Sequence, residues 1–168
     1  IHYNNCTVTD SKIASIFDYL YEQYTAERMT MLERLPQISE YASENMTYHL
    51  INDILTSDNR FSCLKVLCHI PLRQIIKDTS LMSQEELAYA SNYNTHVDFL
   101  VTNSISKKPV LAIETDGYSF HNDATEQHQR DKMKDHIFAL YSLPLLRLST
   151  KGSGERERII EQLTNCVY

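Results

Sequence analysis

Tryptophan is absent from this chain of 168 residues, and glycine is scarce, with only three residues. No Gly-rich loop is present to hold phosphates, which argues against an ATPase. No apolar run comes near the roughly 20 residues that a membrane span needs, and no signal-peptide pattern opens the chain. The sequence therefore predicts a globular domain with no membrane partner.

The four cysteines form neither a CxxC motif nor the spacing of a disulfide framework. We interpret them as free thiols of a cytoplasmic protein. Zinc-ligand spacing and a Ser-His-Asp series are also missing, which argues against zinc modules and acyl hydrolases. The formal net charge of −6 argues against a surface that coats nucleic acid generally. A nuclease stays possible, because a metal site concentrates acids.

Apolar periodicity predicts a mixed α/β domain. Residues 9–35 and about 39–56 have apolar side chains at three- and four-residue spacing, which indicates two helices. The elements expected after them are a strand at 61–71, a short helix at 84–90, strands at 95–102 and 109–115, a helix at 123–142, a strand at 145–149 and a final helix to about residue 166. This order favours a mixed central sheet flanked by helices, with residues 1–38 as a helical extension and 39–168 as the main domain.

Acidic residues stand in two predicted strands where apolar residues are expected. Asp98 lies inside one apolar run, and Glu114 and Asp116 end the next. Glu114 and Asp116 project from one strand face, where Asp98 of the neighbouring strand can meet them. Three such acids suit Mg²⁺ or Mn²⁺, which would activate water for phosphodiester cleavage. The alternative is a plain strand end, where Asp116 starts a turn and Glu114 pairs with Lys or Arg.

One pattern runs through the second half of the chain: Asp98, then Ile113-Glu114-Thr115-Asp116-Gly117, His121, Arg130-Asp131 and Lys134-Asp135. It resembles the PD-(D/E)XK restriction-endonuclease-like superfamily over about residues 40–165. Within that superfamily it is most similar to a very-short-patch-repair-like branch, found as a C-terminal domain of superfamily 1 helicase-type proteins. The resemblance implies an αβββαβ core, Mg²⁺-dependent hydrolysis of DNA, and an upstream helicase or ATPase region as partner. Asp98 and Glu114 correspond to the metal ligands of the signature.

The pattern departs from the superfamily at Asp116, where the signature has a lysine that positions water and stabilises developing charge. Some members supply this cation from the following helix, which makes Lys134 the candidate; an ordinary surface lysine is the alternative. Glu44 corresponds to an acid that many of these nucleases have in the helix before the first core strand. Alternatively, its negative charge stabilises the N-terminus of that helix through the helix dipole. His121 could act as a general base or contact a phosphate, as a histidine does in the repair branch; a surface histidine is the alternative.

The remaining candidates concern nucleic-acid binding. We expect Arg130 and Arg147 to contact phosphates, although Arg147 could equally neutralise the acids. Gln127 shares a helix face with Lys134, and we expect it to contact nucleic acid together with the two arginines.

His96 lies on the strand face of Asp98 and is a weaker candidate, while His69, His128 and His136 look incidental. The main rival function is a catalytically inactive module of the same fold for DNA binding or protein docking. RNA as the substrate and a homodimer formed through the N-terminal helices are further alternatives.

Overall fold

The computed structural model describes residues 2–3, 6–7, 13, 15–16, 18–20, 22–23, 26, 35–116, 124–149 and 154–167. The chain divides into two compact units, Ile1–Gln37 and Ile38–Tyr168. In the first, β1 (His2–Tyr3) pairs antiparallel with β2 (Cys6–Thr7). Its described positions from 13 to 26 are helical, which confirms the predicted helix there. The strand pair was not predicted, because two-residue strands carry no periodic signal.

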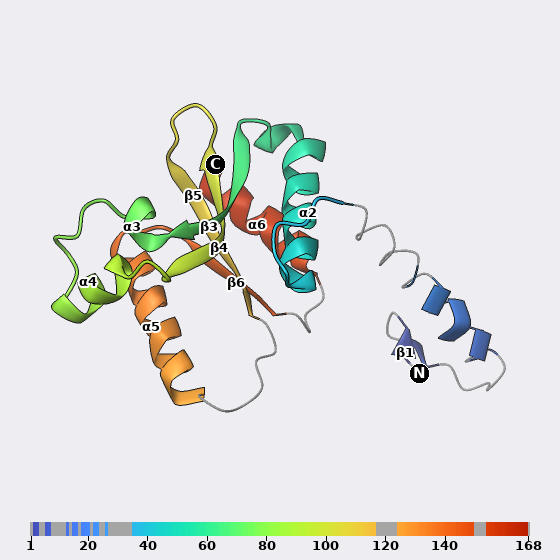
Figure 1. Ribbon diagram of the computed structural model, residues 1–168. Coiled ribbons are helices and arrows are strands. Elements are labelled where there is room, and N and C mark those ends of the chain that lie inside the picture. The colour runs from blue at the N-terminus through green and yellow to red at the C-terminus, as the bar shows by residue number, and fades with distance from the viewer. Residues whose placement is uncertain are drawn as a thin grey trace. The chain divides into compact units, whose positions relative to one another are not determined.

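The second unit contains a four-stranded mixed sheet with helices on both faces (Figure 1). Its elements are α2 (Ala42–Ser57), the 3-10 turn η1 (Asn59–Phe61), β3 (Leu64–Pro71), α3 (Leu72–Ile75), α4 (Gln84–Ser91), β4 (His96–Asn103), β5 (Pro109–Asp116), α5 (Ala124–Leu140), β6 (Leu145–Ser149) and α6 (Glu155–Val167). The strand order is β3-β4-β5-β6, antiparallel except for the parallel pair β5 and β6. The predicted sheet and its flanking helices are confirmed. No helix in the described ranges is both long and apolar enough to cross a membrane.

Local hydrogen bonds decide where two elements begin. The carboxylate of Asp58 accepts a hydrogen bond from the backbone N–H of Arg60, which forms η1 and delays β3 to Leu64 instead of the expected residue 61. Before α2, the side-chain oxygen of Asn45 accepts from the backbone N–H of Ile38 and of Ser39, and so satisfies donors that precede the helix.

Two apolar layers cover the two faces of the sheet. On one face, α2 and α6 pack against strand residues such as Phe99 and Ile113, which have no exposed surface. On the other face, Ile137 and Phe138 of α5 pack against Leu100 and its neighbours. Burying each of these side chains is worth about 1.5–3 kcal/mol before chain entropy is counted. Because Ile137 and Phe138 face the sheet, residues one turn earlier in α5 also point toward it.

Helix α4 is held in place at its first turn. Ser83 and Glu86 form a capping box, in which the Ser83 hydroxyl accepts from the Glu86 N–H and the Glu86 carboxylate accepts from the Ser83 N–H. The same carboxylate pairs with Nδ1 of His136 on α5. This contact links α4 to α5. His136, which was expected to be incidental, therefore has a structural role.

Candidate functional site

A row of polar residues crosses the sheet near the ends of its strands. The antiparallel pair Phe99 and Ile113 is followed outward by Asp98 and Glu114. Glu114 is paired in turn with Arg147 on β6. The printed pairing ends at Phe99 and Ile113, so Asp98 and Glu114 are the next residues along each strand, and the charge of Asp98 acts on Glu114.

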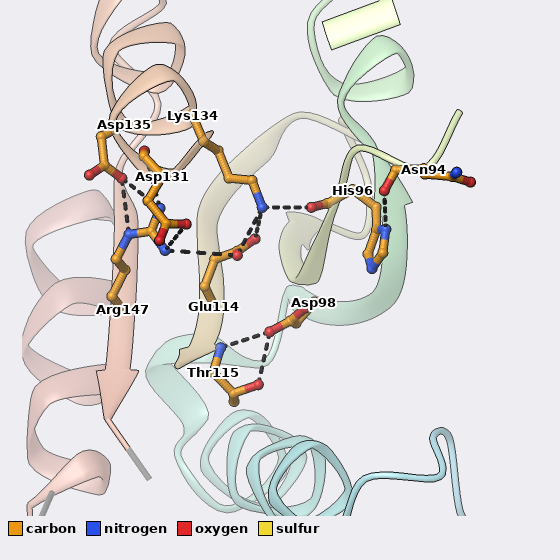
Figure 2. Close-up of polar contacts among 9 residues, drawn as sticks. All are labelled: Asn94, His96, Asp98, Glu114, Thr115, Asp131, Lys134, Asp135 and Arg147. Carbon is orange, nitrogen blue, oxygen red and sulfur yellow. Dashed lines mark hydrogen bonds and ion pairs between the residues drawn. The ribbon is translucent and has the colours of Figure 1, made fainter. Parts of the chain in front are cut away.

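Glu114 is buried, with 8% of its surface exposed, and it meets Lys134 of α5. The Lys134 ammonium lies 2.9 Å from each carboxylate oxygen of Glu114 and donates a third hydrogen bond to the carbonyl of His96, also at 2.9 Å (Figure 2). Helix α5 therefore delivers a cation to the acid on β5. Burial disfavours both charged groups, and the attraction between the ammonium and the carboxylate offsets this cost.

Asp98 has different partners from those of Glu114. Its Oδ2 accepts hydrogen bonds from the backbone N–H and the hydroxyl of Thr115, at 2.7 and 2.8 Å. This carboxylate thus continues the ladder between β4 and β5 where the two backbones separate (Figure 2). Charge-assisted bonds of this kind are stronger than neutral ones, so Asp98 is firmly oriented beside Glu114.

The pKa of Glu114 is raised from 4.5 to about 7, chiefly by burial. The ammonium of Lys134 lowers this pKa, the neighbouring carboxylate of Asp98 raises it, and Arg147 lowers it. A carboxyl group with a pKa of about 7 exchanges a proton for a cation readily at neutral pH. The charge of Glu114 is therefore sensitive to added positive charge at neutral pH.

Arg147 pairs mainly with acids on α5, whereas the alternative role expected for it was to neutralise the acids on the strands. Its guanidinium lies 3.3 Å from a carboxylate oxygen of Asp131, 2.9 Å from one of Asp135 and 4.0 Å from one of Glu114. Partial burial acts to lower the pKa of Arg147, but the hydrogen bond and charge of Asp135 and the charges of the other two acids raise it. The side chain thereby fixes α5 to β6 beside the Lys134 contact.

Glu44 approaches the same end of the sheet from the first turn of α2. Its Oε2 is buried without a hydrogen-bond partner in the described part of the chain and lies 3.7 Å from Nε2 of His69. The pairs Cys68–Phe99 and Ile70–Val97 between β3 and β4 flank His69 and Asp98, and the ring of His69 meets His96 edge-on, with centroids 5.6 Å apart. His69 also has a φ of 51°, a conformation that costs energy for a residue other than glycine.

From the sequence, His69 was expected to be incidental. The signal that could have found it is the strand register, since β3 continues the row that contains Asp98. The register in turn could not be read without knowing where β3 begins.

Several predicted site residues are not placed in full. The backbone of Asp116 ends β5 opposite Ser149, and that of Gln127 lies in α5, but their side chains are outside the described part of the structure, as is all of His121. Arg130 is exposed on α5. Within the described residues, no three His, Cys, Asp or Glu side chains surround one point as metal ligands. The carboxylate of Asp98 faces Thr115 instead.

Comparison with known proteins gives one match. The sequence model of a family described as "Protein of unknown function (DUF2726)" matches residues 40–166, which covers nearly all of the second unit and every site residue discussed above. Neither the curated proteins nor the solved structures yielded a match.

Proposed function

The chain belongs to the DUF2726 family, and we propose that its α/β unit is a metal-dependent nuclease domain that hydrolyses phosphodiester bonds of DNA. The observation that carries the proposal is the contact of the Lys134 ammonium with both oxygens of Glu114, at 2.9 Å. Phosphoryl transfer needs a fixed cation beside the acids that hold the metal. Here α5 provides that cation in place of the strand position occupied by Asp116.

The side-chain types at this site are those that bind a hard divalent cation such as Mg²⁺ or Mn²⁺. Asp98 and Glu114 offer carboxylate oxygens, the ligands that these ions prefer, and Asp116 provides a third acid in the sequence. The charge of Asp98 contributes to the raised pKa of Glu114, and a divalent cation would relieve that repulsion. The bound ion supplies a lowered pKa for a water molecule and stabilisation of charge on the phosphate.

The other steps, which are stabilising charge, moving a proton and holding the DNA, would fall to side chains of this unit. Lys134 stabilises the charge that develops on the phosphate, and Asp116 adds a ligand or orients water. His121 serves as a general base or contacts a phosphate, and Glu44 holds a water molecule. Arg130 and Gln127 contact the DNA backbone.

The upstream helicase or ATPase region implied by the resemblance would deliver the strand to this site. The reaction class does not depend on that region, because the acids and the cation belong to one unit.

A catalytically inactive domain is the second candidate, and one observation favours it. Lys134 already satisfies both oxygens of Glu114, with Arg147 a further 4.0 Å contact. A carboxylate paired in this way is stable without a metal. Such a domain would keep the fold for DNA binding or protein docking.

Cleavage of end-labelled DNA in Mg²⁺ separates the two candidates. We expect Lys134→Met and Glu114→Gln each to lower the cleavage rate by about 100-fold or more. Lys132→Met is the matched control, because Lys132 is exposed on the same helix, and it should retain the wild-type rate. Wild-type protein that cleaves neither single- nor double-stranded DNA in Mg²⁺ or Mn²⁺ would favour the inactive domain. Equal cleavage by wild type and both site variants would show that the activity arises elsewhere.

A further inference from the structure

An open cleft of about 490 Å³ lies beside the Lys134–Glu114 pair. It runs between the end of α4 with its following loop, the start of β4, and α5. The described residues that line it are Tyr89, Asn92, Asn94, Thr95, His96, Asp98, Arg130, Asp131 and Lys134. Figure 2 shows the carbonyl of His96 at the ammonium of Lys134, on the side opposite Asp131, with Asn94 beside the ring of His96. The cleft therefore opens onto the proposed catalytic residues.

The chemistry of this lining restricts the ligand. Small-molecule pockets are mostly apolar, whereas the described lining of this cleft contains no aliphatic side chain. It combines amides, two cations, two acids, a histidine, a threonine and one phenol ring. A ligand that matches it must bear charge, hydrogen-bonding edges and a flat face. A nucleotide has all three.

The size of the cleft suits a single nucleotide. Its volume of about 490 Å³ falls within the range of about 300–1,000 Å³ that suits one small ligand. An unpaired base can present its edge and its flat face to such a hollow, whereas a paired base is stacked inside the double helix.

The wall formed by α4 and its loop is built to stay in position. The capping box at Ser83 and the contact between Glu86 and His136 anchor α4. In the loop, the side chain of Asn92 accepts from the backbone N–H of Asn94, at 3.0 Å, and the Asn94 carbonyl lies 2.9 Å from Nδ1 of His96. Such preorganisation lowers the entropy that binding would cost.

Two side chains on this wall are suited to a base. The carboxamide of Asn94 makes no hydrogen bond within the described part of the chain, and a carboxamide can pair with the edge of a base. Tyr89 offers an aromatic ring for stacking. Burial raises the pKa of its hydroxyl to about 12, so this group stays protonated and can donate.

We propose that the cleft binds one unpaired nucleotide of the strand to be cut, with its phosphate toward Lys134 and Arg130 and its base toward Tyr89 and Asn94. This inference rests on the proposed nuclease function, and it names the substrate class as single-stranded nucleic acid or a strand with an unpaired position. The two cations lie on α5 and the ring and amide on the opposite wall, which sets the direction of the nucleotide.

The test measures binding by fluorescence anisotropy, with Ca²⁺ replacing Mg²⁺ so that the probe is not consumed. The probes are a labelled DNA strand, the blunt duplex of the same sequence, and the same sequence as RNA. We expect a single strand to bind at least about tenfold more tightly than the duplex, and the tighter of DNA and RNA identifies the natural strand.

Three variants locate the binding in the cleft. Asn94→Ala and Tyr89→Ala should each weaken single-strand binding by about tenfold. Tyr93→Ala is the control, because Tyr93 is 70% exposed, does not line the cleft and packs instead against the guanidinium of Arg73. Since Tyr89 is half-buried and its loss could disturb folding, the exposed Asn94 carries the test if Tyr89→Ala is unstable.

Duplex bound as tightly as the single strand, or Asn94→Ala bound like wild type, would overturn the inference. Metal-dependent cleavage with no preference for a single strand would overturn the inference but leave the nuclease function intact. Single-strand binding that is weakened by Asn94→Ala, in a protein that cleaves nothing, would support the cleft and reject the nuclease.

Discussion

Replacing Lys134 with methionine should destabilise the protein in a strongly pH-dependent way. The substitution keeps most of the side-chain volume but removes the ammonium that donates to both oxygens of Glu114. Both side chains are 11% exposed, so water cannot fully replace the lost contact. Breaking a buried ion pair by removing one partner costs about 3–5 kcal/mol when the other partner stays charged.

The pH dependence follows from the pKa of Glu114. This pKa is raised on folding, so its contribution to stability is full below about pH 4.5 and is lost as pH rises through about 7. In the wild type this loss amounts to about 3 kcal/mol and is complete a little above pH 7. Without Lys134 the pKa of Glu114 rises further, and stability continues to fall by about 1.4 kcal/mol per pH unit. The variant should therefore match the wild type closely near pH 5 and be about 3 kcal/mol less stable at pH 9.

Urea unfolding across this pH range measures the difference. Lys134→Met/Glu114→Gln should recover most of the stability at pH 9, because it removes the uncompensated charge. Lys132→Met, on the exposed side of α5, should follow the wild type at every pH. A loss that is the same at pH 5 and pH 9, or one that the second substitution fails to recover, would refute the reasoning about Glu114.

Three further predictions test the site and the fold. The affinity for Mg²⁺ should fall by up to tenfold per pH unit below about pH 7, because a proton competes with the metal for Glu114. Calorimetric titration at several pH values should show this slope. An affinity that does not change with pH would contradict it. Thr115→Val removes the hydroxyl that donates to Asp98 and should cost about 1.5–3 kcal/mol in urea unfolding, whereas an unchanged midpoint would mean that Asp98 is not anchored there. Phe99→Ala empties a position with no exposed surface and should cost about 3–5 kcal/mol, while exposed Tyr93→Ala should change stability by less than about 0.5 kcal/mol.

The sequence predicts the second unit well because its elements carry strong periodic signals. The apolar runs around Asp98 and Glu114 mark β4 and β5 clearly, and the run at 145–149 is bounded by Pro144. The resemblance made Lys134 of the following helix the candidate cation, and its ammonium does lie against Glu114. The inferences about the strands depend only on contacts within a strand.

Contacts between distant segments could not be predicted in the same way. That Asp98 uses Thr115 as its partner depends on where β4 and β5 separate, and no local pattern encodes that point. The approach of Glu44 to His69 depends on how α2 lies against β3. The cleft beside Tyr89 depends on the packing of α4 against α5, to which the contact between Glu86 and His136 contributes.

The central claim is that Asp98 and Glu114 hold a divalent metal for phosphodiester cleavage. The most direct measurement is the melting temperature as Mg²⁺ or Mn²⁺ is titrated, with wild type beside Asp98→Ala/Glu114→Ala and a DNA cleavage assay on the same samples. We expect a metal-dependent rise in melting temperature for the wild type, and neither this rise nor cleavage for the double variant. A wild-type melting temperature that does not change with either metal, with no cleavage of DNA, would contradict it.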